Sequence, residues 1–188
     1  RPLPSGAVSL RQAWAWLLAQ CAIGLAVLLA LPDFAKLVAL GSIPMVALYP
    51  LMKRITWWPQ VWLGLTFNWG VLVAAAATQG TITQADALLY GALILWTLGY
   101  DTIYAIQDRE DDALIGVKST AILFGRADRA MIALFHALTL GLLAWAGART
   151  GLGVPYYMGL AVAATLAVYQ QWLMRGRDRD ACFRAFLN

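Results

Sequence analysis

The sequence predicts an all-α fold, a multi-span transmembrane helical bundle, on three observations. The 188-residue chain is 61% hydrophobic and only 13% charged. Its mean hydropathy of +0.66 reflects long apolar runs that short polar loops separate. Its basic residues gather in alternate loops, as the positive-inside rule describes for membrane proteins. A soluble globular domain is therefore excluded, and we interpret residues 1–188 as a single transmembrane domain.

Six apolar segments are each close to the ~20 residues that a helix needs to cross the hydrocarbon core of a bilayer. In chain order, the predicted spans occupy residues 11–31, 34–52, 60–78, 85–106, 130–147 and 154–174. Polar loops bound each span. The loops at 31–34, 78–86 and 148–153 carry almost no basic residues, whereas those at 52–60, 107–129 and 175–184 carry many.

The basic residues divide unevenly between these two sets of loops. Of 14 Lys and Arg, only Lys36 and Arg149 lie on the sparse side. The other twelve are Arg1, Arg11, Lys53, Arg54, Arg109, Lys118, Arg126, Arg129, Arg175, Arg177, Arg179 and Arg184. This split predicts that the basic side faces the cytoplasm. It also explains the pI near 9.3, so we expect no nucleic-acid partner.

Both ends of the chain are abrupt. It starts at Arg1 without an initiating Met, and it ends soon after a basic loop. We therefore expect an internal fragment of a longer protein. Cys21 falls inside a span and Cys182 in a basic loop, so we expect no disulfide between them.

The most informative stretch is DTIYAIQDREDD at residues 101–112, where five carboxylates follow an apolar span. At 3.6 residues per turn, Asp101, Tyr104, Asp108 and Asp112 share one face of a helix. Carboxylates one turn apart repel unless a cation lies between them, and Mg²⁺ typically takes one or two carboxylates together with substrate phosphates. The spacing therefore predicts that Asp108 and Asp112 bind Mg²⁺.

The remaining acids of this stretch divide by depth. Asp101 follows a mostly apolar run and lies at membrane depth, where an ionisable residue is a functional candidate. Glu110 and Asp111 instead fit a solvated acidic loop whose charge Arg109 and Lys118 balance.

A cationic pair lies at the cytoplasmic end of the second span, in YPLMKRIT at residues 49–56. Lys53 as a point charge and Arg54 as a planar fork could clamp a diphosphate. The same pair could also be an ordinary positive-inside anchor, and both interpretations stay open.

Three further polar positions have two interpretations each. Asn68 lies mid-span, where it either packs against a neighbouring helix or contacts a ligand. Lys118 could contact phosphate, or Ser119 or Thr120 could simply cap the next helix. His136, alone on an apolar span, is expected to be a buried packing residue and not a metal ligand.

Two functions that are not enzymatic also remain open from the residues alone. A cation transporter would place acids at several depths on facing spans, whereas here they cluster at one membrane edge. A non-catalytic membrane scaffold has no motif in its favour.

At this point the chain resembles the UbiA superfamily of membrane prenyltransferases, most closely the 4-hydroxybenzoate polyprenyltransferases of ubiquinone biosynthesis. The resemblance covers nearly the whole chain. Its markers are RPLPSG at 1–6, YPLMKRIT at 49–56, PQVWLG at 59–64, FNWG at 67–70, DTIYAIQDREDD at 101–112 and GVKSTA at 116–121.

The resemblance implies a fold of nine transmembrane helices around a cavity, of which six would lie in this chain. It implies two facing Asp-rich motifs that bind Mg²⁺-diphosphate on the cytoplasmic side. Asp108 and Asp112 match the D-x-x-x-D pair of the second motif, and Asp101 is a further matched carboxylate. Tyr49 and Lys53 match positions that contact the diphosphate region.

The implied reaction moves a polyprenyl group from polyprenyl diphosphate to the ring carbon ortho to the hydroxyl of 4-hydroxybenzoate. Tyr104 and Lys118 lie in the blocks that favour this acceptor. Homogentisate, haem, chlorophyllide or a menaquinone precursor are alternative acceptors in the superfamily. The first Asp-rich motif and a final helix have no counterpart in this sequence, so we expect these residues by themselves to be inactive.

Overall fold

The computed structural model describes residues 2–188; Arg1, which we counted among the cytoplasmic cations, lies outside the described residues. All regular structure in the described chain is helical. The elements are α1 Leu10–Ala30, α2 Asp33–Leu40, α3 Ile43–Ile55, α4 Pro59–Phe67, α5 Gly70–Gln79, α6 Gln84–Gln107, α7 Arg109–Leu114, α8 Thr120–Phe124, η1 Gly125–Ala127, α9 Asp128–Arg149, α10 Val154–Leu173, η2 Met174–Gly176 and α11 Arg179–Leu187. The predicted all-α fold is confirmed.

Every predicted span is helical, but the second and third are each broken into two helices. The break between α2 and α3 follows Gly41, and there the indole of Trp69 donates a 2.8 Å hydrogen bond to the carbonyl of Val38. The break between α4 and α5 lies at Asn68 and Trp69. Non-helical backbone at membrane depth persists only where side chains satisfy the freed carbonyls, which is what happens at both breaks.

The six predicted spans all lie in helices but differ in apolarity. Five helical segments of the described chain are long and apolar enough to cross a membrane: Leu10–Ala30, Asp33–Ile55, Pro59–Gln79, Gln84–Gln107 and Thr120–Arg149. The sixth, α10, has the length at 20 residues but not the apolarity. Its tyrosines and the pair Gln170 and Gln171 interrupt its run of apolar residues.

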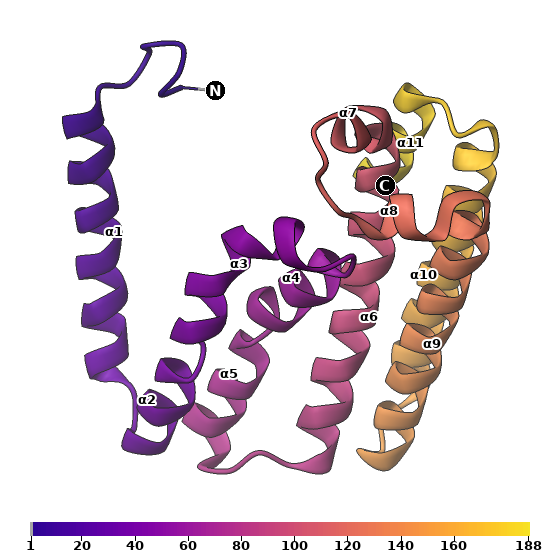
Figure 1. The fold of residues 1–188 in the computed structure, drawn as a ribbon. Helices are drawn as coiled ribbons and strands as arrows, with labels where there is room; N and C mark the ends of the chain where they lie inside the picture. The colour runs from indigo at the N-terminus through magenta and orange to yellow at the C-terminus, as the bar shows by residue number, and fades with distance from the viewer. Residues whose placement is uncertain (1) are drawn as a thin grey trace.

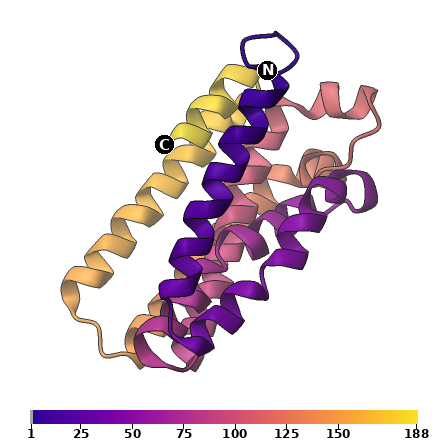
Figure 2. The ribbon, with the colours of Figure 1, turned by 90° about the vertical axis from the view of Figure 1, so that its left-hand side faces the viewer.

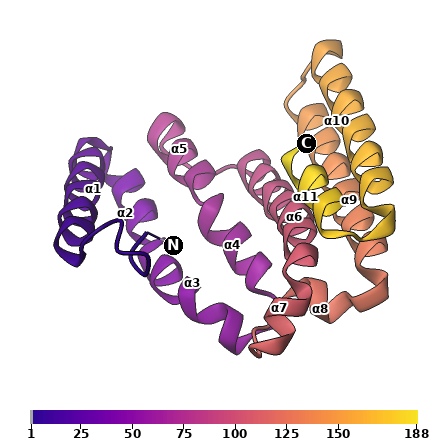
Figure 3. The same cartoon turned by 90° about the horizontal axis from the view of Figure 1, so that it is seen from above.

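The helices run along a common direction, as Figure 2 shows from the α1 side. Seen from above, they follow one another from α1 on one side to α9 and α10 on the other (Figure 3). Helix α6 lies at the centre and packs against α4, α9 and α11. Helix α1 stands apart in Figure 1, and every one of its residues is exposed or half-buried.

The two sets of predicted loops lie at opposite ends of the bundle. The N-terminus, α7, α8 and α11 gather at the upper end in Figure 1, and the turns that follow α1, α5 and α9 lie at the lower end. The basic loops therefore share one end, as the charge pattern predicted.

A buried core underlies this upper end. It joins the last turns of α6 to α8, α9, η2 and α11 through apolar side chains, namely Ile103, Ala105, Ile106, Ala121, Ile132, Met174, Cys182 and Ala185. The residues that follow α6 therefore rest on a packed base, which fixes where the acids of residues 101–112 can lie.

Candidate functional site

The acidic stretch is not one continuous helical face, so that prediction is wrong at Asp108. Helix α6 ends at Gln107, and Asp108 has φ −98° and ψ 2°, outside the helical region, before α7 begins. The backbone N–H of Asp112 still donates a 2.8 Å hydrogen bond to the carbonyl of Asp108. Asp108 to Asp112 therefore form one separate turn, which we call the carboxylate turn.

The carboxylate turn contains an oxygen that lacks a partner. Oδ2 of Asp112 is buried and has no hydrogen-bond partner among residues 2–188. Burial raises the pKa of the Asp112 carboxyl, Lys53 opposes this rise, and Asp108 and Asp111 add to it by like-charge repulsion. A buried carboxylate oxygen without a donor is destabilising unless a further group binds it, and a cation satisfies that requirement.

The donor set suits a hard divalent cation such as Mg²⁺, which prefers oxygen ligands and often takes only one or two carboxylates from the protein. Asp108 and Asp112 would supply those two. Within the described residues, no group of three or more His, Cys, Asp or Glu side chains is arranged to hold a metal. The remaining ligands would therefore come from water, from substrate phosphates or from elsewhere in the protein.

Arg179 of α11 closes the carboxylate turn from the opposite side. Its guanidinium forms ion pairs with Asp111 and, at 3.6 Å, with Asp108. We expected Arg109 and Lys118 to balance the exposed acids. That expectation is wrong, because Arg109 pairs with the buried Asp128 and Lys118 binds backbone carbonyls.

The cationic segment of α3 lies beside the same turn. Lys53 and Arg54 are exposed in its last turn, and none of the ion pairs found in residues 2–188 involves either of them. Lys53 lies within Coulombic reach of Asp101 and of Asp112. Tyr49, one turn earlier and half-buried, lies within reach of Asp101. Predicted cations and predicted acids are thus brought together.

Lys118 ties these two segments to each other. Its backbone N–H donates a 2.9 Å hydrogen bond to the carbonyl of Lys53, and its ammonium donates a 3.1 Å bond to the carbonyl of Ile55. The ammonium also lies 5.6 Å from the centroid of the Trp57 ring. The loop after α7 is therefore attached to the C-terminus of α3, where a cation also complements the helix dipole.

The residues after Lys118 do cap a helix, as one of the two interpretations predicted. The hydroxyl of Ser119 accepts a hydrogen bond from the N–H of Ile122 at the start of α8. Thr120 exchanges a 2.7 Å hydrogen bond with Thr102 of α6, and its N–H donates to Oε1 of Gln60. Gln60 is buried. The sequence analysis did not single it out, because nothing except its position after Pro59 distinguished it.

Asn68 fills the break between α4 and α5. Its amide donates hydrogen bonds to the carbonyl of Gly64, to the carbonyl of Leu93 and, at 2.8 Å, to the hydroxyl of Thr97. Two of these three partners lie on α6. The amide therefore connects the broken helix to the central one, which accounts for a polar residue at this depth.

Asp101 and Tyr104 do not face the same neighbours. The ring of Tyr104 lies 5.0 Å from that of Phe186 on α11, and Tyr104 is 37% exposed. Asp101 is half-buried on the side of α3. Their separation by three residues permits this divergence, since it leaves them about 60° apart around the helix.

Two smaller predictions are confirmed. His136 is buried, as predicted, and its ring lies 5.0 Å from that of Trp96. Cys21 and Cys182 are both free cysteines.

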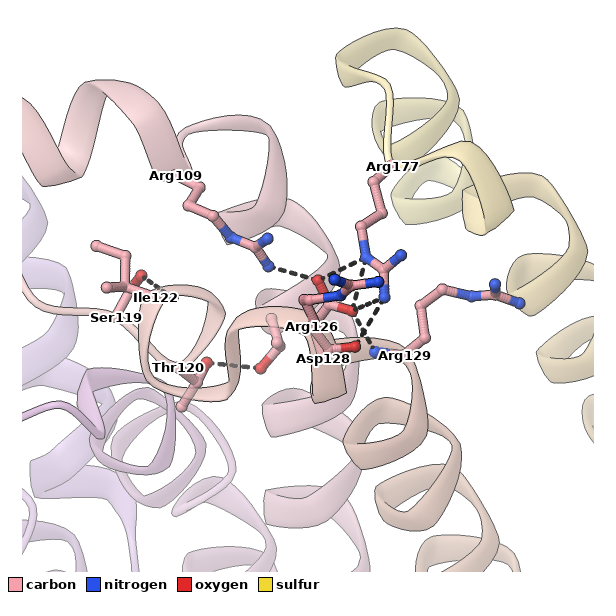
Figure 4. A network of polar contacts seen from close by, with 9 residues as sticks. Arg109, Ser119, Thr120, Ile122, Arg126, Asp128, Arg129 and Arg177 are labelled. Atoms are coloured by element: carbon pink, nitrogen blue, oxygen red, sulfur yellow. Dashed lines mark hydrogen bonds and ion pairs between the residues drawn. The ribbon is translucent and has the colours of Figure 1, made fainter.

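The most connected polar group at this end of the molecule escaped the sequence analysis altogether. Asp128, the first residue of α9, is fully buried and pairs with Arg109 and with Arg177 (Figure 4). An acid that begins a helix is usually explained by the helix dipole, so the sequence offered no signal that two distant arginines meet there.

The chain matches the UbiA prenyltransferase family over residues 1–188. It is 47% identical to a Pseudomonas aeruginosa (strain UCBPP-PA14) protein named 4-hydroxybenzoate octaprenyltransferase, over 100% of this chain and 64% of that protein. A Tolumonas auensis protein of the same name is 48% identical, over 100% of this chain and 66% of that protein. The chain thus spans about two thirds of the length of these relatives.

A solved structure is also similar. The apo structure of a UbiA homolog from Aeropyrum pernix K1 superposes with a TM-score of 0.83 at 30% sequence identity. The match covers 100% of this chain and 72% of that one.

Proposed function

The chain belongs to the UbiA prenyltransferase family, and on that premise we propose that its parent protein transfers a polyprenyl group from polyprenyl diphosphate to 4-hydroxybenzoate. The names of the relatives support the acceptor and the donor. The unpartnered Oδ2 of Asp112, on the same turn as Asp108 and within reach of Lys53, is the observation that carries the proposal.

The acids and cations of this site would divide the substrate between them. Asp108 and Asp112 would hold Mg²⁺, which supplies positive charge to the departing diphosphate. Lys53 and Arg54, both exposed beside the carboxylate turn, would bind the diphosphate oxygens directly. Asp101 would hold the Lys53 ammonium in place through the attraction between their charges.

The proposed reaction breaks the allylic C–O bond, and its electron pair leaves with the diphosphate. The ring carbon ortho to the hydroxyl of 4-hydroxybenzoate then bonds to the allylic carbon, and that ring carbon passes its proton to an oxygen of the released diphosphate. Cationic side chains stabilise the charge that develops on the leaving group. The apolar helices exclude water, which would otherwise capture the allylic cation.

The charge pattern supports a proposal for the side of the membrane on which the site opens. The carboxylate turn lies at the end of the bundle that carries the basic loops. Since such loops face the cytoplasm, we propose an integral inner-membrane enzyme whose site opens to that side.

The principal test replaces Asp108 or Asp112 with Asn in the parent protein, reconstituted in lipid vesicles. We expect Mg²⁺-dependent transfer to fall by about 100-fold or more, because each change removes a carboxylate that would hold the Mg²⁺ whose charge acts on the leaving group. Asp180→Asn is the matched control: this acid of α11 is exposed at the same end and forms no ion pair within residues 2–188. Wild-type rates in both Asn variants would refute the role of the turn.

A second arm of the same experiment addresses the alternatives. Purified parent protein is offered 4-hydroxybenzoate, homogentisate and a menaquinone precursor with the same polyprenyl diphosphate. We expect transfer to 4-hydroxybenzoate to exceed the others. Mg²⁺ uptake into vesicles that lack any prenyl donor would instead favour a transporter.

A further inference from the structure

A buried carboxylate lies directly behind the carboxylate turn. Asp128 is fully buried, and its two oxygens accept hydrogen bonds from Arg109 Nη2, from Arg177 Nε at 3.0 and 3.2 Å, and from its neighbour's backbone N–H at 2.6 Å. Arg177 also donates a 2.8 Å bond to the carbonyl of Arg126. Figure 4 shows Arg109 and Arg177 reaching this carboxylate from two different elements. We call Asp128 with its two arginines the Asp128 cluster.

General stability is a weak reason for such a cluster. Removing charges from water costs about as much as their attraction returns, so apolar residues of similar volume often serve a fold equally well. Within residues 2–188, no hydrogen bond or ion pair joins the Asp128 cluster to Lys53 or Arg54, which the proposed function assigns to the diphosphate. The role of the Asp128 cluster therefore lies in the chain segments that it holds in place.

The cluster holds both flanks of the carboxylate turn. Arg109 follows Asp108 directly in the chain, so fixing its guanidinium fixes the start of α7. Arg177 precedes Arg179 by two residues, and Arg179 contacts Asp108 and Asp111. Both chain segments that reach Asp108 are thus anchored on one buried acid.

A strained backbone supports the same conclusion. Arg177 has φ 56°, and it is the one non-glycine residue of the described chain with positive φ. A bulky residue in this left-handed region persists only where its surroundings fix it. Here the fixing contacts are those of its side chain with Asp128 and with the Arg126 carbonyl. The segment is kept in an unfavourable conformation that brings Arg179 to the acids.

We propose that Asp128 is a positioning residue that sets the placement of Asp108 relative to Asp112, through Arg109 on one side and Arg177 on the other. This inference rests on the proposed function, because the placement matters for divalent-cation binding by those two acids. Groups behind the ligands of a metal commonly change metal affinity by 10- to 100-fold when removed. Asp128 would act in that way without touching metal or substrate.

The test uses Asp128→Asn, which keeps the shape and removes the charge, in the parent protein in lipid vesicles. We expect the Mg²⁺ concentration for half-maximal transfer to rise about 10-fold, with a smaller change in the rate at saturating Mg²⁺. Mn²⁺ binding with inorganic diphosphate, followed by electron paramagnetic resonance, should weaken to the same extent. This second readout does not depend on turnover.

Two companion variants separate positioning from loss of structure. Thr139→Val removes a buried hydrogen bond between α9 and α6, on the same helix but far from the acids, and should lower the melting temperature without changing Mg²⁺ dependence. Arg177→Gly suits the left-handed backbone and removes one of the two arms, so it should fold and give an intermediate shift. It keeps the inference testable if Asp128→Asn fails to fold.

Unchanged Mn²⁺ affinity in folded Asp128→Asn and Arg177→Gly would overturn the inference, whatever happens to the melting temperature. Failure of the proposed function has a different signature. In that case the wild-type protein shows no Mg²⁺-dependent transfer, while the Mn²⁺ measurement still decides whether Asp128 positions the acids.

Discussion

Helices α1 and α6 are both long enough to cross a bilayer, yet they relate to the rest of the molecule in opposite ways. An 18-residue apolar stretch of α1 has a mean hydropathy of 2.0, and none of it is buried. The corresponding stretch of α6 has a mean hydropathy of 1.2, and 44% of it is buried. The more apolar helix is thus the more exposed one. Lipid is a suitable solvent for apolar side chains, so hydropathy reports how well a helix suits the bilayer and not where the protein core lies.

The two helices start alike, so their difference does not arise locally. Each begins with a capping box, formed by Ser9 with Gln12 in α1 and by Thr83 with Asp86 in α6. What separates them is the set of polar and small residues along α6 that meet other helices, such as Gly99 against His136 and Thr97 against Asn68. Three substitution pairs put this contrast to the test.

The largest effect is expected where α6 closely approaches α9. A Cβ added at Gly99 would lie 2.6 Å from Nε2 of His136, whose ring also lies 5.0 Å from that of Trp96. Gly99→Ala should therefore lower the free energy of unfolding by about 1–3 kcal/mol through overpacking. Gly24→Ala in α1 should not lower the free energy of unfolding, since no described atom lies within 4 Å of the added carbon. Thermal unfolding in detergent measures both.

The Gly99 contrast can be sharpened with a double variant. If the clash with His136 is the cause, Gly99→Ala combined with His136→Ala should recover part of the loss, because the added methyl group then occupies vacated space. A double variant as unstable as the sum of the two single ones would place the cause elsewhere.

An intermediate effect is expected at Asn68, whose amide joins the α4–α5 break to α6. Asn68→Ala removes three hydrogen bonds and leaves carbonyls at membrane depth without a donor, which should cost about 1–2 kcal/mol. Gln20→Ala in α1 is the control, because Gln20 is exposed and should change stability little. A change in KM for either substrate at unchanged stability would instead favour the ligand role of Asn68.

The smallest effect is expected at the two caps. Ser9→Ala and Thr83→Ala each remove a solvent-exposed cap and should cost about 0.5–1 kcal/mol. Hydrogen exchange should show only α1 opening in the first variant, because α1 adds little to the packed core. In the second, protection should fall across α4, α6 and α9 together. Equal and local effects in both helices would break the comparison.

The fold was predictable to the extent that it depends on apolarity. The positions of all six helical segments followed from hydropathy, and the gathering of basic loops at one end followed from the charge pattern. The breaks at Gly41 and Asn68 were not predicted, because each lies inside an apolar run and is stabilised by a side chain from another helix. The lower apolarity of α10 depends on its own composition, and Gln170 and Gln171 indicate it in the sequence.

The candidate site was predictable only as a set of residues. The motifs pointed to Asp108, Asp112 and Lys53, and the structure places these three near one another. It also separates Tyr104 from Asp101 and gives Lys118 a link to the end of α3. Those outcomes depend on which neighbour each side of α6 and each loop meets, and a helical period does not specify neighbours.

By itself, the sequence determined which segments are helical, which end of the bundle is charged, and which acids and cations lie at that end. These properties depend on the residue and its near neighbours in the chain, through transfer to lipid and helical geometry. Only the tertiary structure decided that Asp128 receives Arg177 across 49 positions and that Asp111 receives Arg179 across 68. Ion pairs between such distant segments form where packing brings them together, because charges interact through space and not along the chain.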